Sequence, residues 1–133
     1  VSDREIAHWG AHAGVECIGK VDDMNAFWAR AHIACLPSRG GEGLPRTLLE
    51  AAACGRPIVA SAVAGIVDFV TPDIGLLAPA NDPGALAEAI ARLAGDVALR
   101  KAMGFVAREK VLSGYTERHA ADCAARAWAA ARP

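Results

Sequence analysis

Short apolar runs alternate with segments of helical periodicity along this chain, and that alternation limits the folds open to it. Four runs are apolar or β-prone, and each is followed by glycine, proline or serine: residues 15–18, 33–36, 57–60 and 76–78. Strands that alternate with helices at such spacings favour βαβ units with right-handed crossovers. The run at 33–36 is apolar at every position, which is typical of a strand covered on both faces. The sequence therefore predicts an α/β fold built on a parallel sheet.

Helix signals occupy most of the remaining sequence from residue 24 onward. Either residue of an Asp-Asp pair can cap the first helix, and Pro45 suits the first turn of a helix that Gly55 ends. The expected helices cover residues 24–31 and 45–53, start at Pro83 and at Asp96, and finish with a C-terminal helix within residues 116–133. With helices on both faces, the predicted parallel sheet is Rossmann-like.

The predicted sheet is incomplete. Doubly wound nucleotide-binding domains carry about five or six parallel strands. Only four runs are predicted here, and the chain opens in polar sequence without a first strand. All 133 residues fit within one domain. We therefore expect residues 1–133 to be part of a domain in a larger protein.

Composition excludes several classes of partner. The chain is 53% hydrophobic and 22% charged, the balance of a globular protein with a buried core. Fourteen basic and fifteen acidic residues give a net charge of -1, so a nucleic-acid partner is not expected. The four cysteines form no C-x-x-C pair, and no apolar run approaches the roughly 18 residues of a spanning helix. A reducing, cytoplasmic setting is the simplest interpretation.

Two nucleotide-binding motifs match the sequence only in part. Residues 14–20 have the glycine and lysine spacing of a P-loop, but Val21 stands where a hydroxyl must hold magnesium. Gly41 and Gly43 begin a dinucleotide fingerprint, but Arg46 occupies the third glycine position. A side chain there obstructs close packing of helix on strand, which disfavours NAD as a cofactor.

Two histidines at helical spacing raise the question of a metal site. His8 and His12 would share one face of a helix, but the sequence offers no evident third ligand, and Gly10 weakens a helix between them. Because metal sites need convergent ligands, we interpret both as exposed side chains and expect no metal.

A glycine cluster that contains one acid, residues 40–43, follows the run at 33–36 and precedes a predicted helix. This order places the cluster at the carboxyl edge of the sheet, where α/β proteins bind ligands. Glycines let a ligand approach the backbone, and the free N–H groups at the start of the helix, near residues 44–46, favour an anion. The sequence thus predicts an anion site between the run and the helix.

Two carboxylates flank this predicted anion site. Glu42 lies within the glycine cluster and Glu50 lies further along the helix. Carboxylates do not bind phosphate, but they accept hydrogen bonds from sugar hydroxyls on either side of a pyrophosphate, which suits a sugar nucleotide. A simpler alternative stays open at this point: Glu42 favours the helix dipole and Glu50 only solvates the outer face of the helix.

Residues 18–116 resemble the C-terminal domain of glycosyltransferase family 4, whose members are retaining sugar transferases of the GT-B fold. The stretch "EGLPRTLLEAAACGRPIVAS" is similar to the family's E-x7-E signature and its continuation. "GKVDDMNAFWARAHIACLPS" resembles the strand, helix and strand that precede it. "GLLAPANDPGALAEAIARL" and "ALRKAMGFVAREKV" resemble the loop and the two helices that follow. The order of these stretches makes the match more specific than one motif.

The resemblance implies a role for each residue of the glycine cluster and helix. Glu42 would be the catalytic residue that contacts the donor sugar near its reacting centre, and Glu50 would bind the ribose hydroxyls. The backbone at Gly43 and Leu44 would hold the diphosphate. The donor-binding residues expected from the resemblance are Gly41, Gly43, Leu44, Pro45 and Glu50. Family members work without a bound metal, so we expect no metal and no cofactor beyond the donor substrate.

The resemblance also implies a parent enzyme with a second domain. The family's N-terminal acceptor domain and the start of its donor domain have no counterpart here, so we expect this chain alone to be inactive. The parent would move a sugar from a nucleotide-diphosphate-sugar, with UDP-sugars favoured, to a glycan or lipid-linked acceptor. The sequence is most similar to the branch that makes bacterial cell-surface polysaccharides. Such a parent would be cytoplasmic, and its full-length form can be peripheral to the inner membrane.

One departure and two alternatives accompany this prediction. "AGIVDFV" places Val67 and Asp68 where the family commonly has proline and glutamate. A sugar-nucleotide epimerase would share the fold, whereas a phosphorylase would need a pyridoxal lysine in a context that this sequence lacks. A non-catalytic Rossmann-like binding module is the alternative from another class, and nucleotide binding that depends on Glu50 separates it from a transferase.

Overall fold

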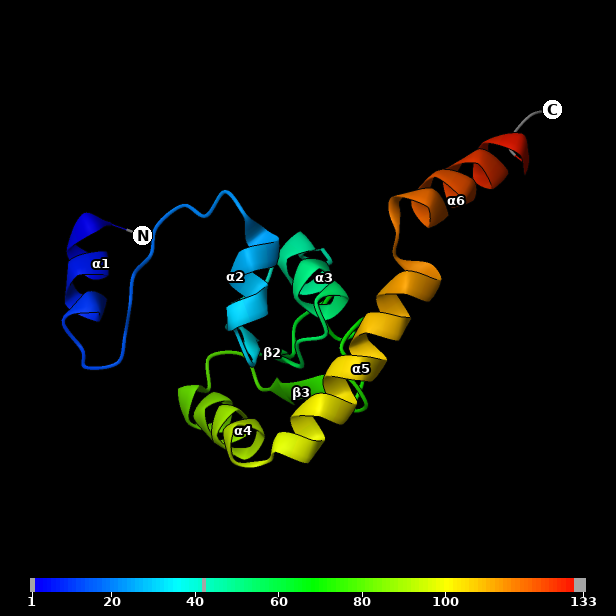
Figure 1. The fold of residues 1–133 in the computed structure, drawn as a ribbon. Coiled ribbons are helices and arrows are strands. Elements are labelled where there is room, and N and C mark those ends of the chain that lie inside the picture. The colour runs from blue at the N-terminus through cyan, green and yellow to red at the C-terminus, as the bar shows by residue number, and fades with distance from the viewer. Residues whose placement is uncertain (1, 42, 131–133) are drawn as a thin grey trace.

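A computed structural model describes residues 2–41 and 43–130 of the chain. Its elements, in chain order, are α1 (Asp3–Gly10), α2 (Met24–Arg30), β1 (Ala34–Leu36), α3 (Arg46–Ala53), β2 (Ile58–Ser61), β3 (Gly75–Ala78), α4 (Pro83–Gly95), α5 (Val97–Gly114) and α6 (Glu117–Ala130). Figure 1 shows α2 to α5 gathered around the strands.

The sheet of the described residues has three parallel strands in the order β1-β2-β3. Ala34 of β1 lies opposite Ile58 of β2, and Ile58 lies opposite Gly75 of β3. Strand order follows chain order, with α3 connecting β1 to β2. The α/β fold with a parallel sheet is therefore confirmed.

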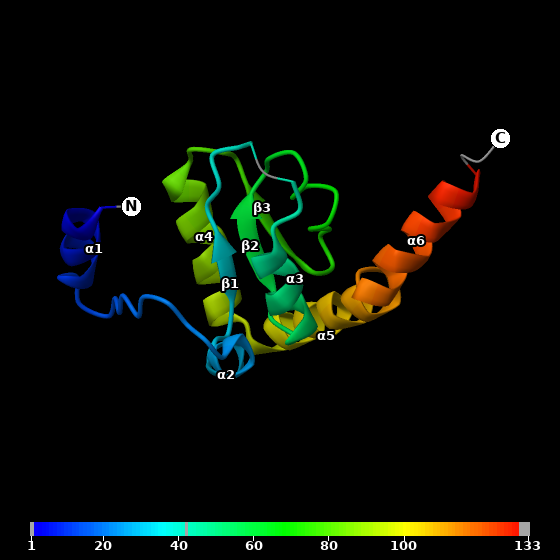
Figure 2. The ribbon, with the colours of Figure 1, turned by 90° about the horizontal axis from the view of Figure 1, so that it is seen from above.

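Helices cover both faces of the central strand. Ile58 and Ala60 face the larger core cluster, which includes buried residues of α3 and α5, whereas Val59 faces a smaller cluster with Leu93 of α4 and Met103 of α5. This alternation follows from the two-residue period of a strand. Figure 2 shows α3 and α4 on opposite sides of the strands. The prediction of a Rossmann-like sheet between two helical layers is confirmed.

Two strand predictions are wrong in detail. Residues 15–18 form no strand, and Val15 and Ile18 are 48% and 46% exposed. No strand of the described chain pairs with them, and β-prone residues need a partner to form a ladder. The run at 33–36 does form β1, but the side chain of Cys35 is exposed rather than covered on its face. The reason is that β1 lies at the edge of the described sheet, while α4 packs on β2 and β3.

Helix α3 begins and ends slightly differently from the sequence prediction. Pro45 is the residue before the helix, with an extended backbone (φ -67°, ψ 130°), rather than its first helical residue. At the other end, Gly55 adopts φ 69°, and the N–H groups of Gly55 and Arg56 donate to the carbonyls of Ala52 and Ala51. This pair of bonds is a Schellman motif, which needs a left-handed residue such as glycine.

Helices α4 and α5 begin as the sequence predicts. The carboxylate of Asp82 accepts a hydrogen bond from the Ala85 N–H at 2.9 Å, and Asp96 accepts one from the Leu99 N–H at 2.8 Å. Aspartate is a favourable N-cap because it pairs an otherwise free N–H of the first turn. These two caps place the α4–α5 junction at Asp96.

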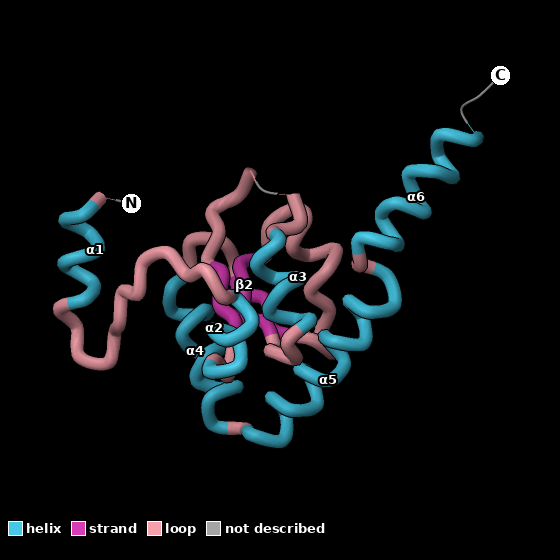
Figure 3. Tube along the Cα trace, turned by 45° about the horizontal axis from the view of Figure 1, so that its top comes forward, coloured by secondary structure: helices cyan, strands magenta, loops and turns pink. Residues whose placement is uncertain are grey.

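Helices α1 and α6 project away from the sheet and bury no residue. Figures 1 and 3 show them on opposite sides of the molecule. The C-terminal helix was predicted within residues 116–133 and is observed as Glu117–Ala130. Across the described residues, no helix combines the length and apolarity needed to cross a membrane.

Candidate functional site

The carboxyl ends of all three strands open onto one edge of the sheet. Residues 37–41 and 43–45 follow β1, residues 62–74 follow β2, and residues 79–82 follow β3. In Figure 2 the strand arrows point toward these loops. Ligands of parallel α/β domains bind at this edge, so it is the candidate site.

The predicted donor loop lies between β1 and α3 at this edge. Gly40 and Gly41 adopt φ 127° and 79°, backbone conformations that residues with side chains rarely take. A Cβ atom added at Gly40, Gly41 or Gly43 would meet nothing within 4 Å, so a ligand has open access to this backbone. Glu42, the predicted catalytic residue, lies outside the described residues.

The start of α3 offers N–H groups with no capping side chain. Pro45 makes no side-chain hydrogen bond to the helix. The Leu48 N–H donates to the Pro45 carbonyl at 3.0 Å, but the N–H groups of Arg46 and Thr47 have no partner among the described residues. Unpaired N–H groups at a helix N-terminus attract anions. Leu44 and Pro45, both half-buried, fix the chain just before this end.

Glu50 lies one turn into α3 and its carboxylate is already paired. Its Oε1 atom lies 2.9 Å from Nε of Arg46, a side chain that is 86% exposed, whereas the Glu50 side chain is 31% exposed. Within the described chain, the Oε2 atom accepts no hydrogen bond. Glu50 therefore keeps acceptor capacity toward a hydroxyl, which a carboxylate with up to about four lone-pair sites allows.

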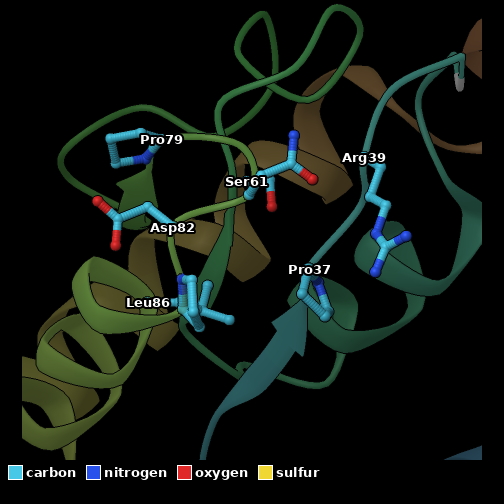
Figure 4. A pocket seen from close by; sticks show the side chains of 8 residues that line it. Pro37, Arg39, Ser61, Pro79, Asp82 and Leu86 are labelled. Atoms are coloured by element: carbon cyan, nitrogen blue, oxygen red, sulfur yellow. The ribbon is translucent and has the colours of Figure 1, made fainter.

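A cavity of about 420 Å³ opens at the same edge, on the β3 side of the β1–α3 loop (Figure 4). Such a volume lies within the range of small-molecule sites, about 300–1,000 Å³. Its lining residues are Pro37, Arg39, Ser61, Pro79, Asn81, Asp82, Pro83 and Leu86. None of the predicted donor-binding residues lines it. Gly41, Gly43, Leu44, Pro45 and Glu50 are therefore not among the residues that surround this cavity.

The polar groups of this cavity were not predicted from the sequence. Ser61 is only 4% exposed, and it lines the cavity at the end of β2. Figure 4 shows Ser61 between Pro79 and Asp82 on one side and Pro37 and Arg39 on the other. The available signal was that Arg39 and Ser61 each lie close to the end of an apolar run. The cavity offers hydrogen-bond donors and acceptors between proline rings, which suits a ligand with hydroxyl groups.

Two other sequence candidates lie elsewhere. His8 and His12 are exposed and their rings meet edge to face at 5.1 Å, and the described residues contain no group of three or more metal-ligating side chains. Asp68 is exposed in the β2–β3 connection, where Phe69 and Val70 enter the core instead. None of these three residues lines the cavity.

The described fold defines a class: a parallel α/β domain with its ligand loops at the carboxyl edge of the sheet. Residues 2–96 match the family model described as glycosyl transferases group 1. The chain belongs to this family of glycosyltransferases.

Known proteins support the same assignment. The chain is 45% identical over 90% of its length to an exopolysaccharide phosphotransferase of Streptomyces coelicolor, and covers 12% of that protein. It is 37% identical over 73% of its length to a GDP-mannose-dependent monoacylated alpha-(1-6)-phosphatidylinositol monomannoside mannosyltransferase of Corynebacterium glutamicum, covering 28% of it. A solved structure, sucrose-phosphate synthase from Thermosynechococcus elongatus, matches with a TM-score of 0.70 and 33% identity over 79% of this chain and 27% of that one. The chain thus spans a small part of each relative.

Proposed function

We propose that this chain is the nucleotide-sugar-binding part of a retaining family 4 glycosyltransferase. The parent protein would transfer a sugar from a nucleotide-diphosphate-sugar to an acceptor hydroxyl of a glycan or lipid-linked saccharide, in the synthesis of a bacterial surface polysaccharide. The other domain of the parent would hold the acceptor across a cleft.

The observation that carries this proposal is the uncapped start of α3 beside an open glycine loop. The N–H groups of Arg46 and Thr47, which have no partner among the described residues, and the left-handed Gly41 offer a cradle for a diphosphate. Glu50 follows one turn later, and its second carboxylate oxygen, which has no partner in the described part of the chain, can accept a hydrogen bond from a ribose hydroxyl. Family membership of residues 2–96 makes a sugar nucleotide the expected ligand.

In the proposed reaction the bond between the sugar's anomeric carbon and the diphosphate breaks while the acceptor oxygen bonds to that carbon. The electron pair leaves with the diphosphate, whose growing charge the α3 N-terminus would stabilise. The acceptor's proton passes to the departing phosphate oxygen. Glu42 would contact the donor sugar near the reacting carbon, and attack on the same face would retain configuration.

The test is a titration of the ¹⁵N-labelled chain with UDP, GDP, ADP and NAD. We expect one nucleoside diphosphate to shift the amide signals of Gly41, Gly43 and Leu44 saturably. UDP is the favoured base, and GDP is the second candidate because one relative is named as GDP-mannose-dependent. NAD should give no such response.

Variants locate the response on α3. Glu50→Gln removes the negative charge but keeps the shape of the side chain, and should weaken nucleotide binding at least about tenfold, since charge-assisted hydrogen bonds contribute about 1.5–3 kcal/mol. The matched control is Glu88→Gln on α4, an exposed glutamate in a helix that does not line the cavity. Amide shifts that persist unchanged in Glu50→Gln, or no shifts with any nucleotide, would contradict donor binding. The alternative of a non-catalytic binding module would then be favoured.

A second candidate is that the parent transfers a sugar phosphate, because the Streptomyces coelicolor relative is named an exopolysaccharide phosphotransferase. Both candidates bind the same donor but break different bonds. Glycosyl transfer releases a nucleoside diphosphate, whereas transfer of the sugar phosphate releases a nucleoside monophosphate. Chromatography of the nucleotide that the full-length parent releases distinguishes them.

A further inference from the structure

A second cavity, of about 230 Å³, lies at the opposite, amino edge of the sheet. It is lined by His32, Arg56, Val97, Arg100 and Lys101. His32 and Arg56 lie just before β1 and β2, and the other three residues belong to the first turns of α5. In Figure 2 this is the end of the sheet from which the strand arrows start, next to α2 and the α4–α5 junction.

The charges around this cavity have one sign. Arg56, Arg100 and Lys101 are cations at neutral pH, and no carboxylate lines the cavity. The ion pairs of the described residues are Lys20–Asp22 and Arg46–Glu50, so none of the three cations is neutralised by one. Asp96 caps α5 beside them, but its carboxylate accepts from the Leu99 N–H and does not line the cavity. The three like charges that line the cavity repel one another, and an anionic ligand would relieve that repulsion.

One of these cations carries an unpaired buried donor. The Nε–H of Arg56 is buried and has no hydrogen-bond partner within the described structure. The backbone of Arg56 is fixed because its N–H donates to the Ala51 carbonyl at 2.9 Å in the turn that ends α3. Because this atom has almost no accessible surface, a ligand oxygen accepts a hydrogen bond from it only after the Arg56 side chain shifts toward the cavity. Such a bond would recover the cost of the unpaired donor, about 1–3 kcal/mol.

The other cations are held in place by α4 and α5. Nη1 of Arg100 donates to the carbonyls of Leu93 and Ala94, both at 2.6 Å, and thereby closes the last turn of α4. Among the described residues the Arg100 side chain donates only through Nη1, so its other nitrogens remain available to a ligand. Lys101 is exposed and follows Arg100 in the first turns of α5, whose 18 residues direct the positive end of a helix dipole to the same place.

We propose that this cavity is an anion site that binds a single phosphoryl group, separate from the donor loop at the other edge. Arginine guanidinium groups match the geometry of phosphate oxygens, and lysine adds a point charge. The small volume suits one phosphate rather than a whole nucleotide. The phosphate could belong to a free ion or to a lipid headgroup, and the experiment below distinguishes these sources.

The test is a titration of the ¹⁵N-labelled chain with inorganic phosphate, and with sodium chloride at matched ionic strength. Phosphate should shift the amide signals of Val97, Arg100 and Lys101 and the Nε–H signal of Arg56 saturably, whereas chloride should not. In the lipid arm, phosphatidylcholine vesicles with and without a phosphoinositide are sedimented with the chain. If the chain sediments only with vesicles that contain the phosphoinositide, the ligand is a lipid headgroup. If phosphate shifts the amide signals but the chain does not sediment, the ligand is a free phosphate ion.

Two variants keep the proposal falsifiable. Arg56→Gln and Lys101→Gln should each weaken phosphate binding about tenfold, because each removes a charge-assisted hydrogen bond. Lys101 is exposed, so its substitution tests the site even where Arg56→Gln unfolds the chain. Lys20→Gln, which removes an exposed cation that does not line the cavity, is the matched control. Absence of saturable phosphate shifts, or equal binding by Lys101→Gln and the control, would overturn the proposal.

Discussion

Nε of Arg46 lies 2.9 Å from Oε1 of Glu50, one turn further along α3. Arg46 occupies the position of the third glycine in a dinucleotide fingerprint. Glu50 carries the carboxylate that we propose binds the ribose. An exposed pair of this spacing contributes only about 0.3–0.5 kcal/mol to a helix. The ion pair with Arg46 therefore affects the orientation of the Glu50 side chain more than the free energy of unfolding.

Arg46→Ala should consequently separate a structural role from a binding role. We expect the free energy of unfolding, measured by urea denaturation, to fall by no more than about 0.5 kcal/mol. UDP affinity, measured by calorimetry, should stay within about threefold of the unmodified chain, because the carboxylate remains and loses only a weak exposed partner. If Arg46→Ala weakens UDP binding as strongly as Glu50→Gln does, Arg46 itself contacts the nucleotide.

Gly104→Ala tests the packing of α5 on the end of α3. A Cβ atom at Gly104 would overlap the carbonyl oxygen of Gly55, so the two backbones must move apart. Overpacking of this kind costs about 1–3 kcal/mol, and thermal unfolding should detect it as a lower Tm. Gly114→Ala in the same helix is the matched control, because nothing lies within 4 Å of its added Cβ. Equal melting temperatures for the two variants would show that α5 does not pack here as described.

Lys110→Met tests how α5 holds the connection between β2 and β3. The ammonium Nζ of Lys110 donates to the Phe69 carbonyl at 2.7 Å and to the Thr71 hydroxyl at 3.1 Å. Methionine keeps the apolar stem but leaves these acceptors unpaired, so we expect a loss of about 1–2 kcal/mol in the free energy of unfolding. Amide exchange at Ile74 should become faster. Lys20→Met should change neither, since its ion pair is 89% exposed on both sides.

The pH dependence of α1 should follow Glu5. The Ser2 backbone N–H donates to Glu5 Oε2 at 2.8 Å and lowers the pKa of that carboxyl, and the Ser2 hydroxyl adds to the effect. A pKa lower in the helix than in the unfolded segment stabilises α1 above the usual glutamate pKa, and this contribution is lost as the pH falls through the lowered value. Cα chemical shifts of residues 3–10 should therefore move toward coil values on acidification. In Glu5→Gln the Cα shifts of α1 should depend much less on pH. If their pH dependence is unchanged, another titrating group causes it.

Local signals predicted most of the helices because their causes act within one turn. Asp82 and Asp96 cap α4 and α5 through an N–H three residues away, and Gly55 ends α3 through the next two peptide groups. The same locality explains the error at residues 15–18. A β-prone run cannot show whether a neighbouring strand exists to pair with it.

The sequence by itself determined the alternation of strands and helices, the glycine loop before α3 and the family to which the chain is similar. Only the tertiary structure decided that Cys35 is exposed, that Ser61 and Arg39 line one cavity, and that Arg56 and Lys101 line another. Periodicity and capping depend on residues within about four positions, which a sequence displays directly. A cavity depends on which strand ends and helix turns meet in space, and parallel pairing brings together residues that lie tens of positions apart in the chain.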